Sequence, residues 1–158
     1  MTGHDEFVAA EQQRLLGLAH ALTGDPHDAW DLTQETLARV IEKWARIHGD
    51  PGAYARTIMV RLNVDRIRRR GRERPTSEPP DRAVAAVLVG EVDAWLVAAL
   101  RTLSPHQRTA LALRYVEDLD TRQIADRMGC SEGTARSHLS RGTARLKDHA
   151  HGREQELT

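Results

Sequence analysis

Cysteine, aromatic residues and long apolar runs are all scarce in this chain. Its 158 residues include one cysteine, Cys130, which excludes an internal disulfide and a multi-cysteine metal cluster and indicates a reducing setting. Aromatic residues make up 4%, too few for a typical β-sandwich. No stretch approaches the ~18 apolar residues of a membrane span, and the acidic N-terminus lacks the layout of a signal peptide. We therefore expect a cytoplasmic, all-helical protein with no membrane insertion.

Net charge is also missing, because 23 Lys and Arg residues balance 23 Asp and Glu residues. The charges nevertheless alternate in blocks along the chain. Residues 1–50 hold 4 basic and 9 acidic side chains, whereas residues 53–74 hold 8 basic and 2 acidic ones. Residues 75–100 are acidic again, and residues 121–149 hold 6 basic and 3 acidic side chains. Two basic blocks set between acidic ones indicate two separate nucleic-acid contacts and separate acidic surfaces.

Helical periodicity and capping signals divide the first part of the chain into three helices. The first apolar-periodic run stops before Gly24, and Asp25 followed by Pro26 starts a second helix that is expected to end near His48. A second Asp-Pro pair starts a third helix over residues 52–70. The apolar stripe expected on the second helix comprises Leu37, Val40, Ile41 and Trp44.

A linker separates this part from a second helical part. Residues 71–82 contain three prolines, one glycine and no large apolar residue. We therefore expect an all-α protein of two small helical domains, residues 1–70 and 83–158, joined by a flexible linker at 71–82. Each domain is near the lower size limit for an independent core.

The strongest local signal is a helix-turn-helix in the second domain, which is expected to contain four helices. A short helix over residues 121–128 is followed by a turn at Gly129 and an N-cap at Ser131, and the last helix runs to about residue 149. The outward face near the start of this helix is positioned to reach base edges and phosphates, and comprises Gly133, Arg136, Ser137, Ser140 and Arg141. The simpler alternative is a helical hairpin with a solvated charged face.

Two further charged features have a functional and a simpler interpretation each. The basic run 66–70 is suited to phosphates, although cations are favoured at any helix C-terminus. The acidic face of the second helix is suited to a basic protein partner, although the residues alone favour an ordinary solvated helix face. Eight histidines are scattered, and no metal-ligand spacing, Gly-rich phosphate loop or nucleophile elbow is present. We expect no enzymatic activity, no bound metal and no cofactor.

The order of these features resembles one known family. An acidic helix that contains residues 31–39 precedes the helix from Tyr54 to Arg70, the proline-rich linker, the segment 103–108 and the helix-turn-helix. Together they resemble bacterial RNA polymerase sigma factors of the extracytoplasmic-function group, of actinobacterial type, over residues 5–148. The resemblance implies a protein that binds core RNA polymerase and directs promoter recognition and transcription initiation.

The resemblance also implies a role for three sets of residues. The set that docks on the clamp of the largest polymerase subunit comprises Asp31, Leu32, Gln34 and Glu35. The set that recognises the −10 promoter element comprises Arg56, Arg61, Asn63, Asp65 and Arg66, with the loop 47–52. The set that reads the −35 element comprises Thr134, Arg136, Ser137, Ser140 and Arg141. The implied partners are core RNA polymerase and promoter DNA, and the sequence leaves an anti-sigma factor open.

Three residues depart from the family pattern. Trp30 stands where an acidic residue is usual, which predicts altered docking or an inward-packed side chain. Arg61 stands where asparagine is common, and Asn63 follows two residues later, so the recognised −10 bases are not defined by the resemblance. Ala135 replaces a usual valine, which predicts lost core volume in the second domain.

Three other functions are compatible with a basic helix-turn-helix. One is a transcriptional regulator, like the output module of a response regulator, that binds duplex DNA as a dimer. Another is a sigma-like protein that sequesters polymerase without initiating. The third is an RNA-binding helical protein, against which the scarcity of stacking aromatics counts.

Overall fold

A computed structural model describes residues 3–72 and 94–157, and within these two stretches every regular element is helical. The elements in chain order are α1 (Gly3–Thr23), α2 (Pro26–Glu42), the 3-10 helix η1 (Trp44–Arg46), α3 (Pro51–Arg72), α5 (Ala94–Arg101), α6 (Pro105–Tyr115), α7 (Thr121–Met128) and α8 (Glu132–Leu157). The expected all-α class is confirmed. The linker expected at 71–82 lies, beyond residue 72, outside the described residues.

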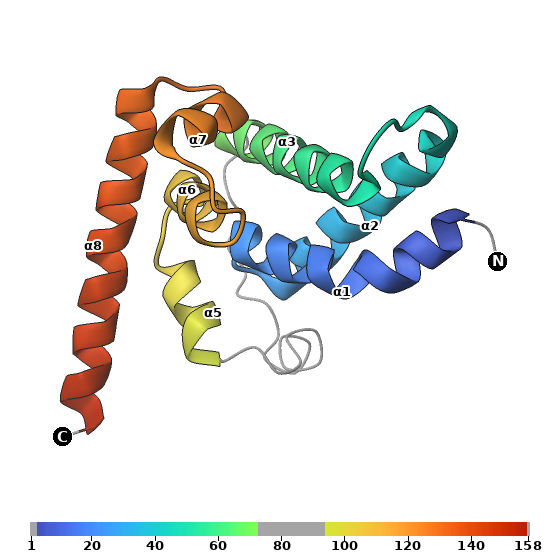
Figure 1. Cartoon of the computed structure of the whole chain (residues 1–158). Coiled ribbons are helices and arrows are strands. Elements are labelled where there is room, and N and C mark those ends of the chain that lie inside the picture. The colour runs from blue at the N-terminus through green and yellow to red at the C-terminus, as the bar shows by residue number, and fades with distance from the viewer. Residues whose placement is uncertain (1–2, 73–93, 158) are drawn as a thin grey trace.

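The turn between α1 and α2 forms as the sequence predicts. Gly24 adopts a left-handed backbone with φ of 64°, and its N–H donates to the carbonyl of His20 at 2.8 Å. The carboxylate of Asp25 accepts the N–H of Asp28 at 3.0 Å and so caps α2, with Pro26 in the first turn. The short turn places α1 and α2 side by side (Figure 1).

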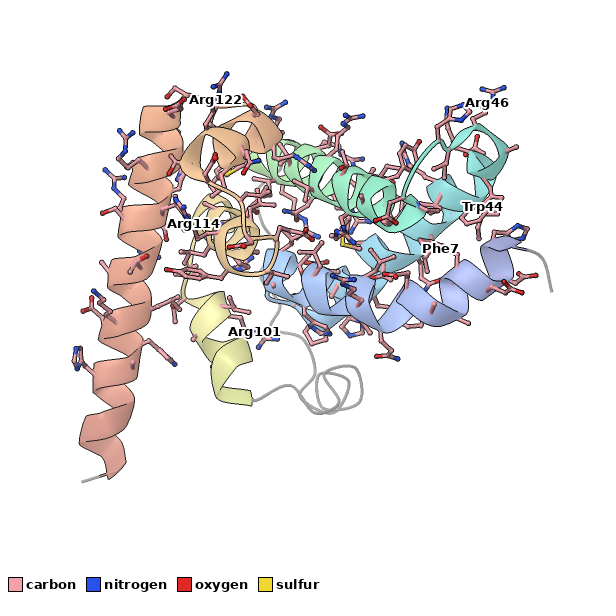
Figure 2. The ribbon with its side chains drawn as sticks, in the orientation of Figure 1. Phe7, Trp44, Arg46, Arg101, Arg114 and Arg122 are labelled. Atoms are coloured by element: carbon pink, nitrogen blue, oxygen red, sulfur yellow. The ribbon has the colours of Figure 1, made fainter. Side chains whose placement is uncertain are left out.

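The second helix ends earlier than expected, at Glu42 rather than near His48. Lys43 leaves the helical conformation, and the chain turns through η1 so that the indole of Trp44 reaches back to Phe7, with ring centroids 5.4 Å apart. Figure 2 shows this pair between the start of α1 and the end of α2. The contact joins the buried ring of Phe7 to the partly buried indole of Trp44, a pairing that favours the turn over a longer α2. Ile41 is 40% exposed, so its place in the expected apolar stripe is also corrected.

The second part of the chain follows its capping signals closely. Ser104 and Gln107 form a reciprocal capping box at the start of α6. Gly129 ends α7 in a left-handed conformation with φ of 67°, and the hydroxyl of Ser131 accepts the N–H of Thr134 at 3.1 Å at the start of α8. The last helix extends to Leu157, beyond the expected end near 149, because residues 150–157 hold mostly good helix formers.

Helix α8 is held against α6 by a close crossing. Gly142 is buried there, and a Cβ atom at this position would lie 2.9 Å from Cδ1 of Leu111. The rings of His106 and His138 stack between the same helices with centroids 5.2 Å apart. Burial, reinforced by His106 and Arg141, lowers the pKa of His138. These contacts fix the orientation of α8 relative to α6.

The two parts of the chain pack against each other and share one apolar core. Buried residues of α1, α2 and α3 and buried residues of α6, α7 and α8 belong to a single cluster. Helix α6 contacts α1, and α7 contacts α3, whose C-terminal end lies beside α7 in the upper part of Figure 1. Each small half therefore gains burial that it would lack alone.

None of the described helices is long and apolar enough to cross a membrane. Within the same residues, no group of three or more His, Cys, Asp and Glu side chains is placed to hold a metal ion.

Candidate nucleic-acid interface

Only some of the residues that we assign to the docking face of α2 are exposed to solvent. Asp31 and Gln34 are exposed, and Glu35 is half-buried. Leu32 is fully buried in the core. The assignment of Leu32 to the docking set stays a prediction. In the structure its side chain packs α2 against the rest of the molecule, and an aliphatic side chain gains free energy from such burial.

Two ion pairs join α2 to the basic end of α3. Nη2 of Arg66 donates to Oε2 of Glu35 at 2.6 Å, and the guanidinium of Arg70 donates to both carboxylate oxygens of Asp28 at 2.8 Å. The hydrogen bond from Arg66 lowers the pKa of Glu35, and the hydrogen bond from Arg70 lowers the pKa of Asp28. Part of the basic run is thus committed to holding two helices together and is not simply solvated.

Sequence reasoning missed these pairs, although a signal for them exists. Asp28 and Glu35 lie two turns apart on α2, and Arg70 and Arg66 lie one turn apart near the end of α3. When two neighbouring helices run antiparallel, an acidic pair at the start of one meets a basic pair at the end of the other. The pairs line a shallow polar groove with Asp31 and Arg69.

Two apolar side chains stand beside the acidic face. Trp30 and Ile41 are each 40% exposed on α2. Of the two outcomes expected for Trp30, inward packing is therefore only partial. A half-exposed indole next to Asp31 and Gln34 gives this face the mixed aromatic and polar character of a protein-binding surface.

The residues assigned to the −10 element occupy different environments on α3. Arg61 and Asp65 are exposed. Asn63 is 3% exposed, and its Nδ2 donates to Oγ1 of Thr109 on α6 at 2.9 Å. Nε of Arg56 lies 3.2 Å from Oε2 of Glu117. Arg66 is paired with Glu35. Of the five residues, Arg61 and Asp65 are therefore the two whose side chains are exposed.

The residues assigned to the −35 element are brought together on α8. Thr134, Arg136, Ser140 and Arg141 are exposed, and Ser137 is half-buried. They share the first three turns of a helix whose N-terminus is capped by Ser131. Backbone N–H groups at a helix N-terminus and guanidinium groups both favour phosphate oxygens, and this exposed face has the size to enter a major groove. Ala135 is fully buried beneath it.

An open groove beside this face was not foreseen from the sequence. It has a volume of about 550 Å³, and it is lined by Leu111, Arg114, Tyr115, Thr121, Arg136, Leu139, Ser140, Thr143, Ala144 and Lys147. Tyr115 is 74% exposed at its edge. The groove joins α6, α7 and α8, so it depends on tertiary packing that no local pattern encodes. Its basic lining extends the positive surface around Arg136.

Comparison with known proteins assigns each of the two parts of the chain to a known family. Residues 7–73 match the family described as Sigma-70 region 2, and residues 93–146 match the family described as Sigma-70, region 4. An RNA polymerase sigma-E factor of Streptomyces avermitilis is 35% identical over 154 residues, which cover 95% of this chain and 86% of that protein. The ECF RNA polymerase sigma factor SigE of Mycolicibacterium smegmatis is 36% identical over 161 residues, covering 94% of this chain and 62% of that protein.

Solved structures agree with the sequence comparisons. The sigma factor RpoE of Bartonella quintana, solved in complex with the anti-sigma factor NepR, superposes with a TM-score of 0.64 at 25% identity, covering 92% of this chain and 95% of that one. The extracytoplasmic function sigma factor SigJ of Mycobacterium tuberculosis superposes with a TM-score of 0.61 at 28% identity, covering 94% of this chain and 55% of that one.

A two-part helical fold with a region 2 half and a region 4 half defines a sigma-70-type initiation factor. The chain belongs to the RNA polymerase sigma factors of the extracytoplasmic-function group. The expected family and its actinobacterial type are confirmed, because the relatives named above include proteins of Streptomyces and Mycolicibacterium.

Proposed function

We propose that this sigma factor binds core RNA polymerase through α2 and positions promoter DNA through α3 and α8. The exposed face of α2 around Asp31 and Gln34 docks on the clamp of the largest subunit, with Glu35 at its edge. Helix α3 and the loop 47–52 hold the −10 element, and the exposed face of α8 around Arg136 and Arg141 reads the −35 element. The protein acts in the cytoplasm and catalyses no reaction itself.

The observation that carries this proposal is the division of surfaces within one chain. An acidic face on α2 and an exposed basic face on α8 lie on different halves of the fold. Each basic footprint alone binds DNA weakly, and a polymerase that holds the protein supplies the second contact as an intramolecular one. This arrangement favours promoter binding in the polymerase complex over random DNA binding by the free protein.

Run-off transcription with purified core polymerase tests the proposal. Genomic fragments of the source bacterium serve as templates, and core polymerase without the protein is the control. We expect discrete transcripts that require the protein. Confirmed binding to core polymerase without any transcript would instead identify a protein that sequesters polymerase, and tight binding of a palindromic site by a dimer without polymerase would identify an ordinary helix-turn-helix regulator.

An anti-sigma factor is a further proposed partner. Support comes from the similarity of this fold to RpoE, which was solved with NepR. Co-purification from the source bacterium after crosslinking tests this partner, and recovery of core polymerase subunits in the same experiment serves as the positive control.

A further inference from the structure

Two histidine rings lie face to face where α6 and α8 meet. His106 stands in the first turn of α6 and is exposed, and His138 stands on α8 and is half-buried. Their ring centroids are 5.2 Å apart and the ring planes are inclined by 20°, so the two imidazoles are stacked. The contact between α6 and α8 therefore contains two groups that can each take up a proton.

The contact between α6 and α8 leaves little room around this stack. Gly142 lies one turn beyond His138, and a Cβ atom at Gly142 would lie 2.9 Å from Cδ1 of Leu111 on α6. Further along α8, Nη1 of Arg145 donates to the carbonyl of Thr102 at 2.7 Å. Because packed helices resist sliding past each other, repulsion between the two rings is relieved by tilting α8 away from α6.

The surroundings of His138 oppose a positive charge on its ring. Burial is the main cause that lowers the pKa of His138, and His106 and Arg141 lower it further. Among the residues that the structure describes, these two are the charged or titratable groups that act on the ring: His106 comes from α6, Arg141 comes from α8 itself, and α5 and α7 contribute none. His106 also lies at the N-terminal end of α6, where the helix dipole disfavours a cation.

Proton binding and the helix contact are linked through this difference in environment. The stacked arrangement takes up a proton at His138 less readily than an arrangement in which the ring is solvated, because the pKa is lowered in the stack. The stack is therefore fully favoured above the ordinary histidine pKa and loses population as the pH falls below it. For one histidine with an ordinary pKa of about 6.5, the ratio of stacked to separated molecules falls by up to about tenfold at pH 5.5.

We infer that the stack of His106 on His138 is an acid-sensitive joint, which holds α8 at its angle while both rings are neutral and lets α8 tilt away from α6 when they are charged. This inference rests on the −35 role proposed above for α8. Ser137 and Arg141 lie within one turn of His138, so a tilt of α8 moves the face that reads DNA. Acid thus weakens recognition of the −35 element, whereas a simple gain of positive charge would strengthen DNA binding.

Distances between spin labels test the joint in the free, full-length chain. Tyr115 at the end of α6 and Asp148 on α8 are exposed and serve as label sites, as Tyr115→Cys and Asp148→Cys in a Cys130→Ala background. Between about pH 7.5 and pH 5.5, a second distance should appear by double electron–electron resonance, and the ratio of the original to the new population should fall about tenfold. A single unchanged distance over this range would overturn the inference.

Neutral substitutions in the same labelled chain test whether His138 is the group that responds. His138→Gln keeps a polar side chain that does not titrate, so it should give the original distance at both pH values. His106→Gln should leave a smaller response, because burial and Arg141 still act on His138. The matched control His151→Gln, at an exposed position further along α8, should keep the wild-type response. Circular dichroism checks that each variant is folded, and a full wild-type response in His138→Gln or in His106→Gln would contradict the inference.

Promoter binding by the polymerase complex measures the consequence for recognition. The probe is a duplex promoter recovered from the run-off assay. From about pH 7.5 to pH 5.5, the affinity of the wild-type complex relative to the His138→Gln complex should fall about threefold or more. A ratio that rises would make His138 a phosphate contact instead, and an unchanged ratio would remove the effect on recognition; either result overturns the inference.

Run-off transcripts at about pH 7.5 separate this inference from the proposed function. Transcripts that require the protein, together with label distances that do not respond to pH, remove the joint and leave the promoter role in place. The absence of transcripts removes the promoter role and the effect of the joint on promoter binding with it. The label distances in the free chain then still report whether α8 tilts when His138 takes up a proton.

Discussion

Asp28 and Glu35 hold α3 against α2 through their ion pairs with Arg70 and Arg66, and the same pairs lower the pKa of both carboxyl groups. Because the folded protein keeps these carboxylates charged against Arg70 and Arg66, it binds fewer protons than the unfolded chain around pH 4. The resulting stabilisation is fully present above the unfolded pKa values and is lost as the pH falls through the lower folded values. The contribution of these two carboxylates should therefore be insensitive to small pH changes near pH 7.

We predict that the free energy of unfolding falls between pH 5 and pH 3 and that this fall is shallower in the variant Arg66→Gln/Arg70→Gln. Urea denaturation followed by circular dichroism at several pH values measures it. The control Arg69→Gln removes a charge from the same helix end without removing either pair, so it should keep the wild-type slope. Equal slopes in all three proteins would refute the role of the pairs.

Gly24 is required for two physical reasons at one position. Its φ of 64° is costly for a residue with a side chain, and a Cβ there would lie 2.7 Å from Nε of Arg108. We predict that Gly24→Ala lowers the free energy of unfolding by about 1–3 kcal/mol. Gly17→Ala, in the interior of α1 with nothing within 4 Å of the added atom, should raise it by about 0.5–1 kcal/mol. The same sign for both substitutions in a denaturation experiment would contradict this account.

At the scale of the element, α2 offers a docking face that can be altered without disturbing the core. Asp31 and Gln34 are exposed, whereas Glu35 also holds Arg66, so a change at Glu35 mixes binding with stability. We predict that Asp31→Lys/Gln34→Lys weakens binding to core polymerase at least tenfold with unchanged helicity. Fluorescence anisotropy against core polymerase measures it, and Glu6→Lys on α1 is the control. Retained affinity in the double variant would remove the docking assignment.

Helix α8 offers the corresponding test for DNA. We predict that Arg136→Ala and Arg141→Ala each cost about 1–3 kcal/mol of promoter binding by the polymerase complex, because each removes a base or phosphate contact. Binding to a promoter recovered from the run-off assay, measured by gel shift, checks this. Arg14→Ala, a loss of the same charge on α1, should have little effect. A loss as large for Arg14 as for Arg136 would point to bulk charge instead.

Local sequence signals predicted the helices and their caps well, whereas features that depend on packing between distant residues could not be predicted. The caps at Asp25, Ser104 and Gly129 depend on residues within a few positions of each other, so their hydrogen bonds could be expected from the sequence. The early end of α2 could not, because it depends on the contact of Trp44 with Phe7, 37 positions away. Distant partners of this kind leave no periodic signal.

The candidate site shows the same limit. The exposed arginines of α8 follow from a helical face that the sequence displays, and the structure places them together. The burial of Asn63 beneath Thr109 could not be predicted in this way, because Thr109 lies 46 positions further along the chain. The division into two domains stays a prediction, and the shared core that the described residues form could not be read from either half alone. Which surfaces of a helix are free is decided by tertiary packing and not by the helix itself.

At the scale of the whole molecule, the balanced charge predicts weak binding of the free protein to duplex DNA. The basic blocks are separated by acidic ones, and three arginines of the first basic block, Arg56, Arg66 and Arg70, are paired within the fold. We predict micromolar or weaker affinity that falls steeply with salt, and much tighter binding for the complex with polymerase. Gel shifts of free protein and complex on one promoter at several salt concentrations measure it. Tight, sequence-specific binding by the free protein would contradict the prediction.

The length of α8 affects how its two ends move relative to each other. Its 26 residues extend about 39 Å, far beyond the few turns at its start that face DNA. Helix α6 contacts α8 near Gly142, so α8 is held between its two ends and not at either end. A tilt of about 10° at the DNA end moves the other end by several ångströms. Any change in the angle of α8 at the promoter would therefore also shift the position of its C-terminal end.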